Sequence, residues 1–145
     1  MSSVVESLIA AGRLTRISRD RQLINQLLEQ AQLHVQSAEL LVGSDDSIAA
    51  FQIAYDAVRK SCAALLAYHG LRATSRGGHL ALFECIAELT DELYEYVADF
   101  DMLRQQRNSY EYPTIAGQAP VTSQVQHVVK TAQVVGRIVI ELVCE

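Results

Sequence analysis

The chain is poor in the residues that interrupt helices. Only two of its 145 residues are proline and seven are glycine, which leaves little room for turns. Few turns in a chain with much alanine, leucine and glutamine favour long helices. The three cysteines, Cys62, Cys85 and Cys144, are odd in number and lack the spacing of a CxxC or Cys/His site. They predict free thiols in a reducing compartment, and neither a disulfide framework nor a zinc site.

Long hydrophobic runs are also missing. No apolar run reaches the roughly eighteen residues that a membrane span requires, and the run near the C-terminus is interrupted by Arg137 and Glu141. The N-terminus has no basic segment followed by an apolar core, so we expect no signal peptide. These absences predict a soluble, cytoplasmic protein with no membrane partner.

The short motifs of common enzyme sites are absent as well. The sequence has no P-loop, no dinucleotide-binding fingerprint and no GxSxG nucleophile elbow. A helical bundle can hold two iron ions through Glu-x-x-His motifs, but none of the four histidines follows a glutamate at that spacing. We therefore expect no metal site and no cofactor.

What is present is a globular composition with an acidic balance. Half of the residues are hydrophobic and the mean hydropathy is +0.10, so the chain can bury a core and forms one domain by length. The net charge is −5 and the sequence pI is near 5.3. Such a protein binds nucleic acid poorly in general, so any contact with nucleic acid requires a local basic patch.

Apolar residues recur at helical spacing along most of the chain. The predicted long helices cover about 20–42, 46–69, 79–99 and 122–143, and shorter ones cover 3–11 and 99–113. Short connections between the long helices favour antiparallel neighbours. We predict an all-α fold, an antiparallel up-and-down bundle of four to five helices. The bundle domain spans 20–145, and 1–19 form a short helix and an arginine-rich linker.

Charged residues gather in two segments. Four arginines lie close together in the sequence: Arg13, Arg16, Arg19 and Arg21. They form either a solvated linker or a contact patch for phosphates or an acidic partner. No Lys or Arg occurs between Gly77 and Leu103. The acidic residues of that segment are Glu84, Glu88, Asp91, Glu92, Glu95 and Asp99. They form a solvated face or a site for a basic protein partner.

The segment DFDMLRQQRNSYEYP, from Asp99 to Pro113, places an arginine on an apolar helical stripe. The stripe consists of Phe100, Leu103, Arg107 and Tyr110. A buried guanidinium must be paired or must face a ligand. Arg107 is therefore either a ligand contact or the partner of Glu111 in a surface ion pair, which contributes only about 0.3–0.5 kcal/mol. The proline ends the helix and leaves Tyr112 at its end.

His79 is a further candidate for ligand contact. It follows Gly77 and Gly78 at a predicted helix start, where unpaired backbone N–H groups favour anions. The ordinary alternative is a capping or packing role.

Two stretches resemble the HEPN superfamily of small helical bundles. They are AYDAVRKSCAALLAYHGLR, from Ala54 to Arg72, and RQQRNSYEYP, from Arg104 to Pro113, with an acidic helix between them. The chain is most similar to compact actinobacterial-type members, over about 20–143. Family members carry an arginine, a polar residue and a histidine four to six residues further on. In active members this motif implies metal-independent RNA cleavage at a site shared across a homodimer.

The motif departs from the family pattern at its histidine. Arg107 and Asn108 match the first half, but Tyr112 occupies the histidine position. RNA cleavage through the ribose 2′-OH requires a base of near-neutral pKa and a cation. Arginine provides the cation, whereas tyrosine, with a pKa of about 10, is a poor base that can still donate a hydrogen bond or stack on a nucleobase.

The residue patterns and the resemblance together give a set of site residues and two functions. Arg107, Asn108 and Tyr112 are the candidate catalytic residues, and Arg104, Tyr110 and His79 are further RNA or nucleotide contacts. The first function is a HEPN-like homodimer that contacts RNA or a nucleotide, with metal-independent endoribonuclease activity left open. The alternative is a non-catalytic module, antitoxin-like or otherwise, that binds a cognate or basic protein partner.

Overall fold

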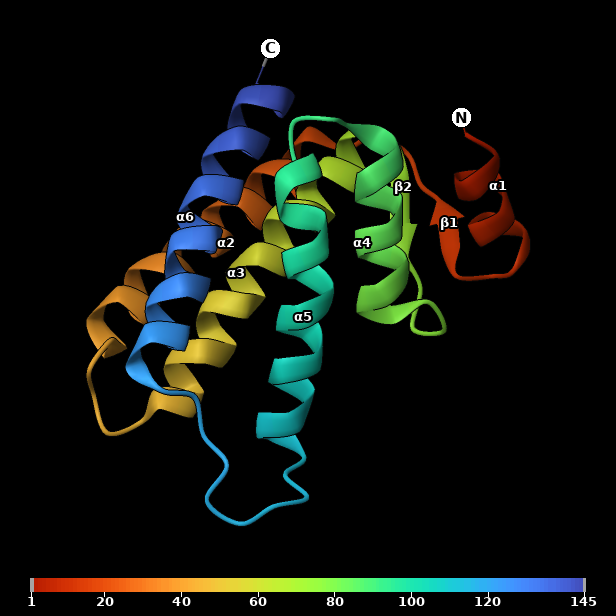
Figure 1. The fold of residues 1–145 in the computed structure, drawn as a ribbon. Helices are drawn as coiled ribbons and strands as arrows, with labels where there is room; N and C mark the ends of the chain where they lie inside the picture. Colours follow the sequence, from red (N-terminus) through yellow and green to blue (C-terminus); the bar gives the residue numbers. More distant parts are fainter. Residues whose placement is uncertain (1, 145) are drawn as a thin grey trace.

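A computed structural model describes residues 2–144 of the chain as a helical bundle with one small sheet (Figure 1). The elements in chain order are α1 (Ser3–Ala10), β1 (Leu14–Arg16), α2 (Arg21–Leu41), α3 (Ser47–Tyr68), β2 (Leu71–Ala73), α4 (Gly78–Leu89), α5 (Tyr94–Glu111) and α6 (Thr122–Val143). The predicted all-α antiparallel bundle is therefore confirmed.

Helix α3 is the centre of the bundle, because α2, α4, α5 and α6 all pack against it. Its buried residues lie all round the helix and include many alanines, which let the neighbouring helices approach closely. Asp46 caps its first turn by accepting a hydrogen bond from the backbone N–H of Ala49 at 3.0 Å. The core of the protein is thus built around a helix with almost no solvent-facing side.

Helix α6 has the bounds that the sequence predicts, although it is rich in β-branched residues that also suit strands. Its buried valines recur at a helical period and pack onto α3. Burial of this stripe decides for helix over strand, because helical propensity is a weak preference that tertiary packing overrides.

The chain reverses direction after α4, where the sequence predicted one helix continuing to Asp99. Helix α4 ends at Leu89 and α5 begins at Tyr94. Thr90 adopts an extended conformation, with φ −157° and ψ 144°. Its hydroxyl accepts a hydrogen bond from the backbone N–H of Glu92 at 3.1 Å, which competes with helical pairing.

Burial of Leu93 anchors this reversal, because the side chain is fully enclosed in the core. The predicted helix boundaries over 79–99 and 99–113 are consequently wrong. Residues from Asp99 to Glu111 belong to the longer helix α5, which runs back alongside α4 (Figure 1). The acidic residues are divided between two helices and the turn that joins them.

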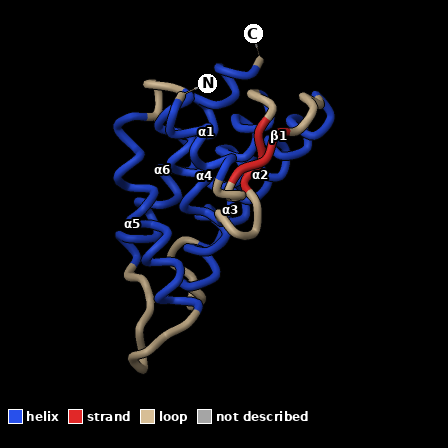
Figure 2. Tube along the Cα trace, turned by 90° about the vertical axis from the view of Figure 1, so that its right-hand side faces the viewer, coloured by secondary structure: helices blue, strands red, loops and turns tan. Residues whose placement is uncertain are grey.

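A strand replaces part of the predicted arginine-rich linker. β1 pairs antiparallel with β2, and Leu14 lies opposite Ala73. The sequence predicted a loop where β2 forms. The two strands lie at one edge of the bundle (Figure 2). Leu14 is buried in the same core as Val5 and Leu8 of α1. The N-terminal segment is therefore packed onto the bundle.

Three of the four clustered arginines have partners within the molecule. Arg16 lies 2.5 Å from a carboxylate oxygen of Glu6, and Arg19 stacks 3.7 Å above the ring of Tyr68. Arg21 donates a hydrogen bond of 3.0 Å to the backbone carbonyl of Val143. These contacts join β1 to α1, the segment before α2 to α3, and α2 to α6, which is a structural role for the cluster.

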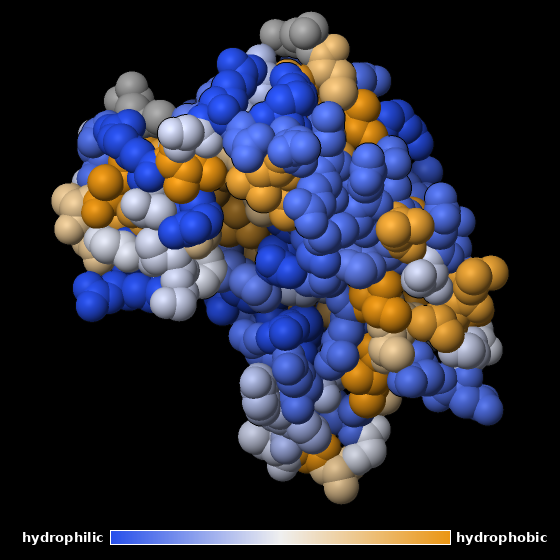
Figure 3. Space-filling view, turned by 180° about the vertical axis from the view of Figure 1, so that it is seen from behind, coloured by the Kyte–Doolittle hydropathy of each residue, from blue (hydrophilic) through white to orange (hydrophobic). Residues whose placement is uncertain are grey.

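Seen from behind, the surface is mostly hydrophilic, and apolar side chains appear in separate patches (Figure 3). Within residues 2–144, no helix combines the length and the apolar character needed to cross a membrane.

Gly77 fixes the position of the first turn of α4. A Cβ atom there would overlap the backbone carbonyl of Arg13 and the side chain of Ala81. We expect Gly77→Ala to lower the free energy of unfolding by about 1–3 kcal/mol, because the backbone at Arg13, just before β1, must shift. Urea denaturation measures this loss. Gly136→Ala is the matched control, because its new Cβ would meet Ser61 Oγ at an ordinary 3.6 Å. Equal losses of unfolding free energy in both variants would contradict the role given to the close contacts at Gly77.

Candidate functional site

A small polar pocket lies where α3, α5 and the first turn of α4 meet α2. Its volume is about 240 Å³. The lining residues are His34, Gln52, Ile53, Tyr55, Asp56, His79 and Arg107. We call it the Arg107 pocket.

Helix α3 supplies most of the polar groups at this site. Gln52, Tyr55, Asp56 and Arg59 recur every three or four residues, which places them on one helical face. His79 enters from the first turn of α4. The turn before it is held by a 3.3 Å hydrogen bond from the backbone N–H of Gly77 to the Thr74 hydroxyl and by Gly78 at φ +56°.

Tyr55 and His79 form the inner pair of the pocket. The Tyr55 hydroxyl lies 2.8 Å from His79 Nδ1. Burial raises the pKa of Tyr55, although the positive charges of Arg107 and Arg104 oppose the rise. Burial, together with the positive charges of Arg59 and Arg107, lowers the pKa of His79 to about 4. At neutral pH the phenol is therefore protonated and the imidazole is neutral.

This pair has one favoured arrangement of protons. Among the described residues, the Tyr55 hydroxyl makes no other hydrogen bond. We therefore assign the hydroxyl as donor to Nδ1, with the ring proton of His79 on Nε2. The imidazole then has an N–H donor to offer, and its acceptor nitrogen is already occupied.

Asp56 is the acidic centre of a neighbouring network on α3. It accepts hydrogen bonds from Arg59, at 2.9 Å from Nε and 2.5 Å from Nη2. Lys60 Nζ and His34 Nε2 each lie 3.3 Å from its other oxygen. Burial opposes its ionisation, but the bonds from Arg59 and the charges of Arg59 and Lys60 outweigh burial and lower the pKa of Asp56.

His34 has the geometry of an ion pair with Asp56 but not the charge. Burial and the nearby positive charge of Lys60 lower the pKa of His34, and the attraction of Asp56 does not reverse this effect. Lys60 Nζ lies 2.8 Å from His34 Nε2, and an ammonium group can only donate in that contact. His34 is therefore a neutral acceptor from Lys60.

Arg107 forms the ion pair with Glu111 that was one of its two predicted roles, and it also lines the pocket. Its side chain is 28 % exposed, lines the pocket and lies 2.6 Å from a carboxylate oxygen of Glu111. It also donates a hydrogen bond of 3.3 Å to Asn108 Oδ1. Arg104 is held in the same way, 2.8 Å from Asp101 on its own helix. Four cations, including Lys60, thus stand near three carboxylates, which leaves the site with a small excess of positive charge.

The structure places the predicted site residues in different surroundings. Arg107 and His79 line the same pocket, with the charge of Arg104 close by. Asn108 is exposed and adjacent to Arg107. Tyr112 is 70 % exposed, follows the last turn of α5 and does not line the pocket.

Tyr110 belongs to the core and not to the face of the pocket. It is 7 % exposed, and its ring packs edge-on against Phe51 with 5.1 Å between centroids. Its hydroxyl donates a hydrogen bond of 3.3 Å to Gln124 on α6. The sequence-based prediction that Tyr110 contacts RNA or a nucleotide is not compatible with this burial.

Several polar residues of the site are not among the candidates that the sequence predicts: His34, Gln52, Tyr55, Asp56 and Arg59. The available signal was the spacing of Asp56 and Arg59 on the same helical face as Tyr55. That spacing cannot indicate which neighbouring helix the face meets.

A second pocket adjoins the first. It has a volume of about 410 Å³, and His79 lines it as well. Its walls are mainly apolar, from residues such as Leu23, Leu27 and Leu82, with Arg72 and Thr74 among the polar ones. Within residues 2–144, no group of three or more His, Cys, Asp or Glu side chains is arranged to hold a metal ion.

The low pKa of His79 predicts a pH dependence of folding. Between about pH 6.5 and pH 4 the unfolded chain binds a proton at this histidine and the folded protein does not, so stability falls as the pH falls through this range. His79→Asn keeps an acceptor for Tyr55 but does not titrate. We expect wild-type protein to lose more unfolding free energy than this variant when urea denaturation is repeated down this pH range. Equal losses would contradict the assignment, since contributions from His34 and Asp56 are common to both proteins.

The family of the chain follows from a comparison with known protein families. The family model described as HEPN domain matches residues 24–142, a range that contains every residue lining the Arg107 pocket. A search of curated proteins finds no match. Because the matched range is most of the chain and the fold is the expected helical bundle, this protein belongs to the HEPN domain family.

Proposed function

We propose that this HEPN-domain protein binds a phosphate group of RNA or of a nucleotide in the Arg107 pocket. The observation that carries the proposal is that Arg107 and a neutral His79 line one pocket, although they come from different helices. The charges of Arg59 and Arg104 act on the same histidine. A guanidinium fork and an imidazole N–H are donors suited to phosphate oxygens.

Binding in this pocket is an exchange of anions. Arg107 is already paired with Glu111, so an incoming phosphate takes the place of that carboxylate. Glu111 is 33 % exposed on its side chain and becomes hydrated when released. The adjoining apolar pocket, which His79 also lines, provides space for a nucleobase.

The geometry favours binding over cleavage. Nδ1 of His79 is occupied by Tyr55, and a pKa of about 4 makes the imidazole a weak base. Tyr112, at the motif position of the missing histidine, lies outside the pocket. We therefore propose phosphate binding in this pocket in preference to RNA cleavage by Arg107 and His79. As in the family resemblance, we expect a homodimer, and the three free thiols favour action in the cytoplasm.

Two observations favour the non-catalytic alternative. The 2.6 Å contact between Arg107 and Glu111 is what a purely structural ion pair would show. Exposed carboxylates of α4, α5 and the turn between them, such as Glu88, Glu92 and Glu95, offer a surface for a basic protein partner. The two functions predict different effects of a substitution at Glu111 on ligand binding.

Titration with labelled RNA and with nucleotides, in EDTA, tests the proposal. We expect Arg107→Ala to weaken binding about tenfold or more, because it removes a charged hydrogen-bond donor. Glu111→Gln should tighten binding, because the guanidinium no longer has a competing carboxylate. Lys130→Ala, which removes an exposed cation of α6, is the matched control and should leave affinity unchanged.

The opposite pattern would support the alternative. There, Arg107→Ala and Glu111→Gln would both lower the melting temperature and neither would alter RNA or nucleotide binding. Analysis of product ends in the same samples addresses cleavage. Cyclic phosphate ends with wild-type protein, absent with Arg107→Ala, would establish metal-independent RNase activity.

A further inference from the structure

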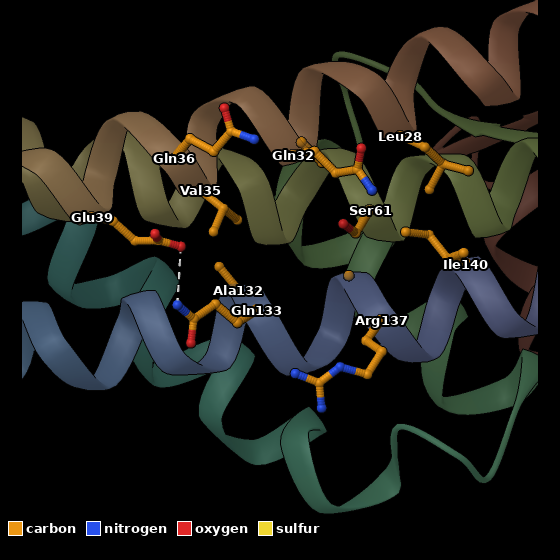
Figure 4. A pocket seen from close by; sticks show the side chains of 12 residues that line it. Leu28, Gln32, Val35, Gln36, Glu39, Ser61, Ala132, Gln133, Arg137 and Ile140 are labelled. Carbon is orange, nitrogen blue, oxygen red and sulfur yellow. Dashed lines mark hydrogen bonds between the residues drawn. The ribbon is translucent and has the colours of Figure 1, made fainter.

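A groove on another side of α3 shares no residue with the Arg107 pocket. It runs between α2 and α6, with α3 as its floor, and has a volume of about 470 Å³ (Figure 4). Its lining includes Leu28 and Val35 of α2, Ser61 of α3, and Gly136, Arg137 and Ile140 of α6. This volume is in the range of small-molecule sites.

Ser61 on the floor of the groove has an unsatisfied hydroxyl. The residue is 1 % exposed, and its Oγ has no hydrogen-bond partner among the described residues. Figure 4 shows its side chain between α2 and α6. A buried hydroxyl without a partner destabilises the protein, and alanine, which is frequent along α3, would avoid that cost.

Gly136 on α6 is a second unfavourable choice at the same place. It lies in the middle of a helix, where glycine is less stable than alanine. Packing does not require it, because an added Cβ would approach Ser61 Oγ only to 3.6 Å. An unsatisfied donor and an unneeded glycine thus face each other across the floor of the groove. Together they place an unpaired hydroxyl next to a position that carries no side chain, at the floor of the groove.

The rest of the lining indicates the chemistry of that ligand. Leu28, Val35 and Ile140 form apolar walls. At one end Glu39 is occupied by a 3.1 Å hydrogen bond from the side-chain amide of Gln133. Arg137, at the rim on α6, forms no ion pair with any described residue, and its guanidinium, which Figure 4 shows on the side of α6 away from α2, reaches an occupant by turning toward the groove.

We propose that this groove binds a small amphipathic carboxylate. Its apolar body lies against the leucine, valine and isoleucine walls and fills the space above Gly136. A ligand oxygen accepts a hydrogen bond from Ser61, and the carboxylate meets Arg137 at the rim. The site is independent of the phosphate site and does not depend on the proposed function.

Calorimetric titration with octanoate, decanoate and phenylbutyrate tests the proposal, with octanol as the uncharged analogue. We expect at least one carboxylate to bind wild-type protein with a Kd of about 1 mM or tighter. Arg137→Gln should weaken carboxylate binding about tenfold and leave octanol unaffected. Lys130→Gln, an exposed position of the same helix, is the matched control and should change neither.

Ser61→Ala and Gly136→Ala provide the sharper test, because each should weaken binding while preserving the fold. Without ligand, we expect Gly136→Ala to raise the melting temperature by about 1–4 °C and Ser61→Ala to leave it equal or higher. With octanoate, both should lose at least about threefold in affinity.

Three results would overturn the inference. One is the absence of binding by every probe at about 5 mM. Another is unchanged affinity in the two floor variants, or a lower melting temperature of Gly136→Ala, which would show that packing requires the glycine. The third is a change in sedimentation of the floor variants, which would show that the groove contacts a second copy of the chain.

Discussion

The near-complete burial of α3 is the constraint on which the rest of this structure depends. Four helices pack around it, and its alanines set how closely they approach. A polar group on such a helix must find a partner or destabilise the protein. Tyr55 is satisfied by His79 and Asp56 by Arg59 and Lys60, whereas Ser61 is not satisfied. Both proposed sites therefore lie beside polar side chains of α3.

Charge balance governs the proposed phosphate site. Each guanidinium near His79 is held by a carboxylate on its own helix, so the arginines are positioned before any ligand arrives. Positioned donors lose little conformational entropy on binding, but the competing carboxylates reduce the net gain. A site of this kind favours a ligand that presents several anionic oxygens, since one such group can replace Glu111 and still engage the imidazole N–H.

The N-terminal segment has a part in forming this site even though it lies outside the matched family range. β1 pairs with β2, and the glycine turn that follows β2 lies directly against the backbone of Arg13. His79 stands two residues after Gly77, at the start of α4. The position of a histidine in the pocket is thus coupled to the packing of the first strand, and both elements act as one structural unit.

Local sequence patterns determined the helical class of the protein, the bounds of α6 and the half-buried position of Arg107, because these depend on the spacing of residues along a single helix. The sequence did not predict the reversal at Thr90. It depends on one hydrogen bond to the Thr90 hydroxyl and on burial of Leu93 by distant residues. The pairing of β1 with β2 and the meeting of Arg107 with His79 join segments far apart in the chain. Tertiary packing alone decided them, because periodicity specifies which face of a helix is polar but not which neighbour that face contacts.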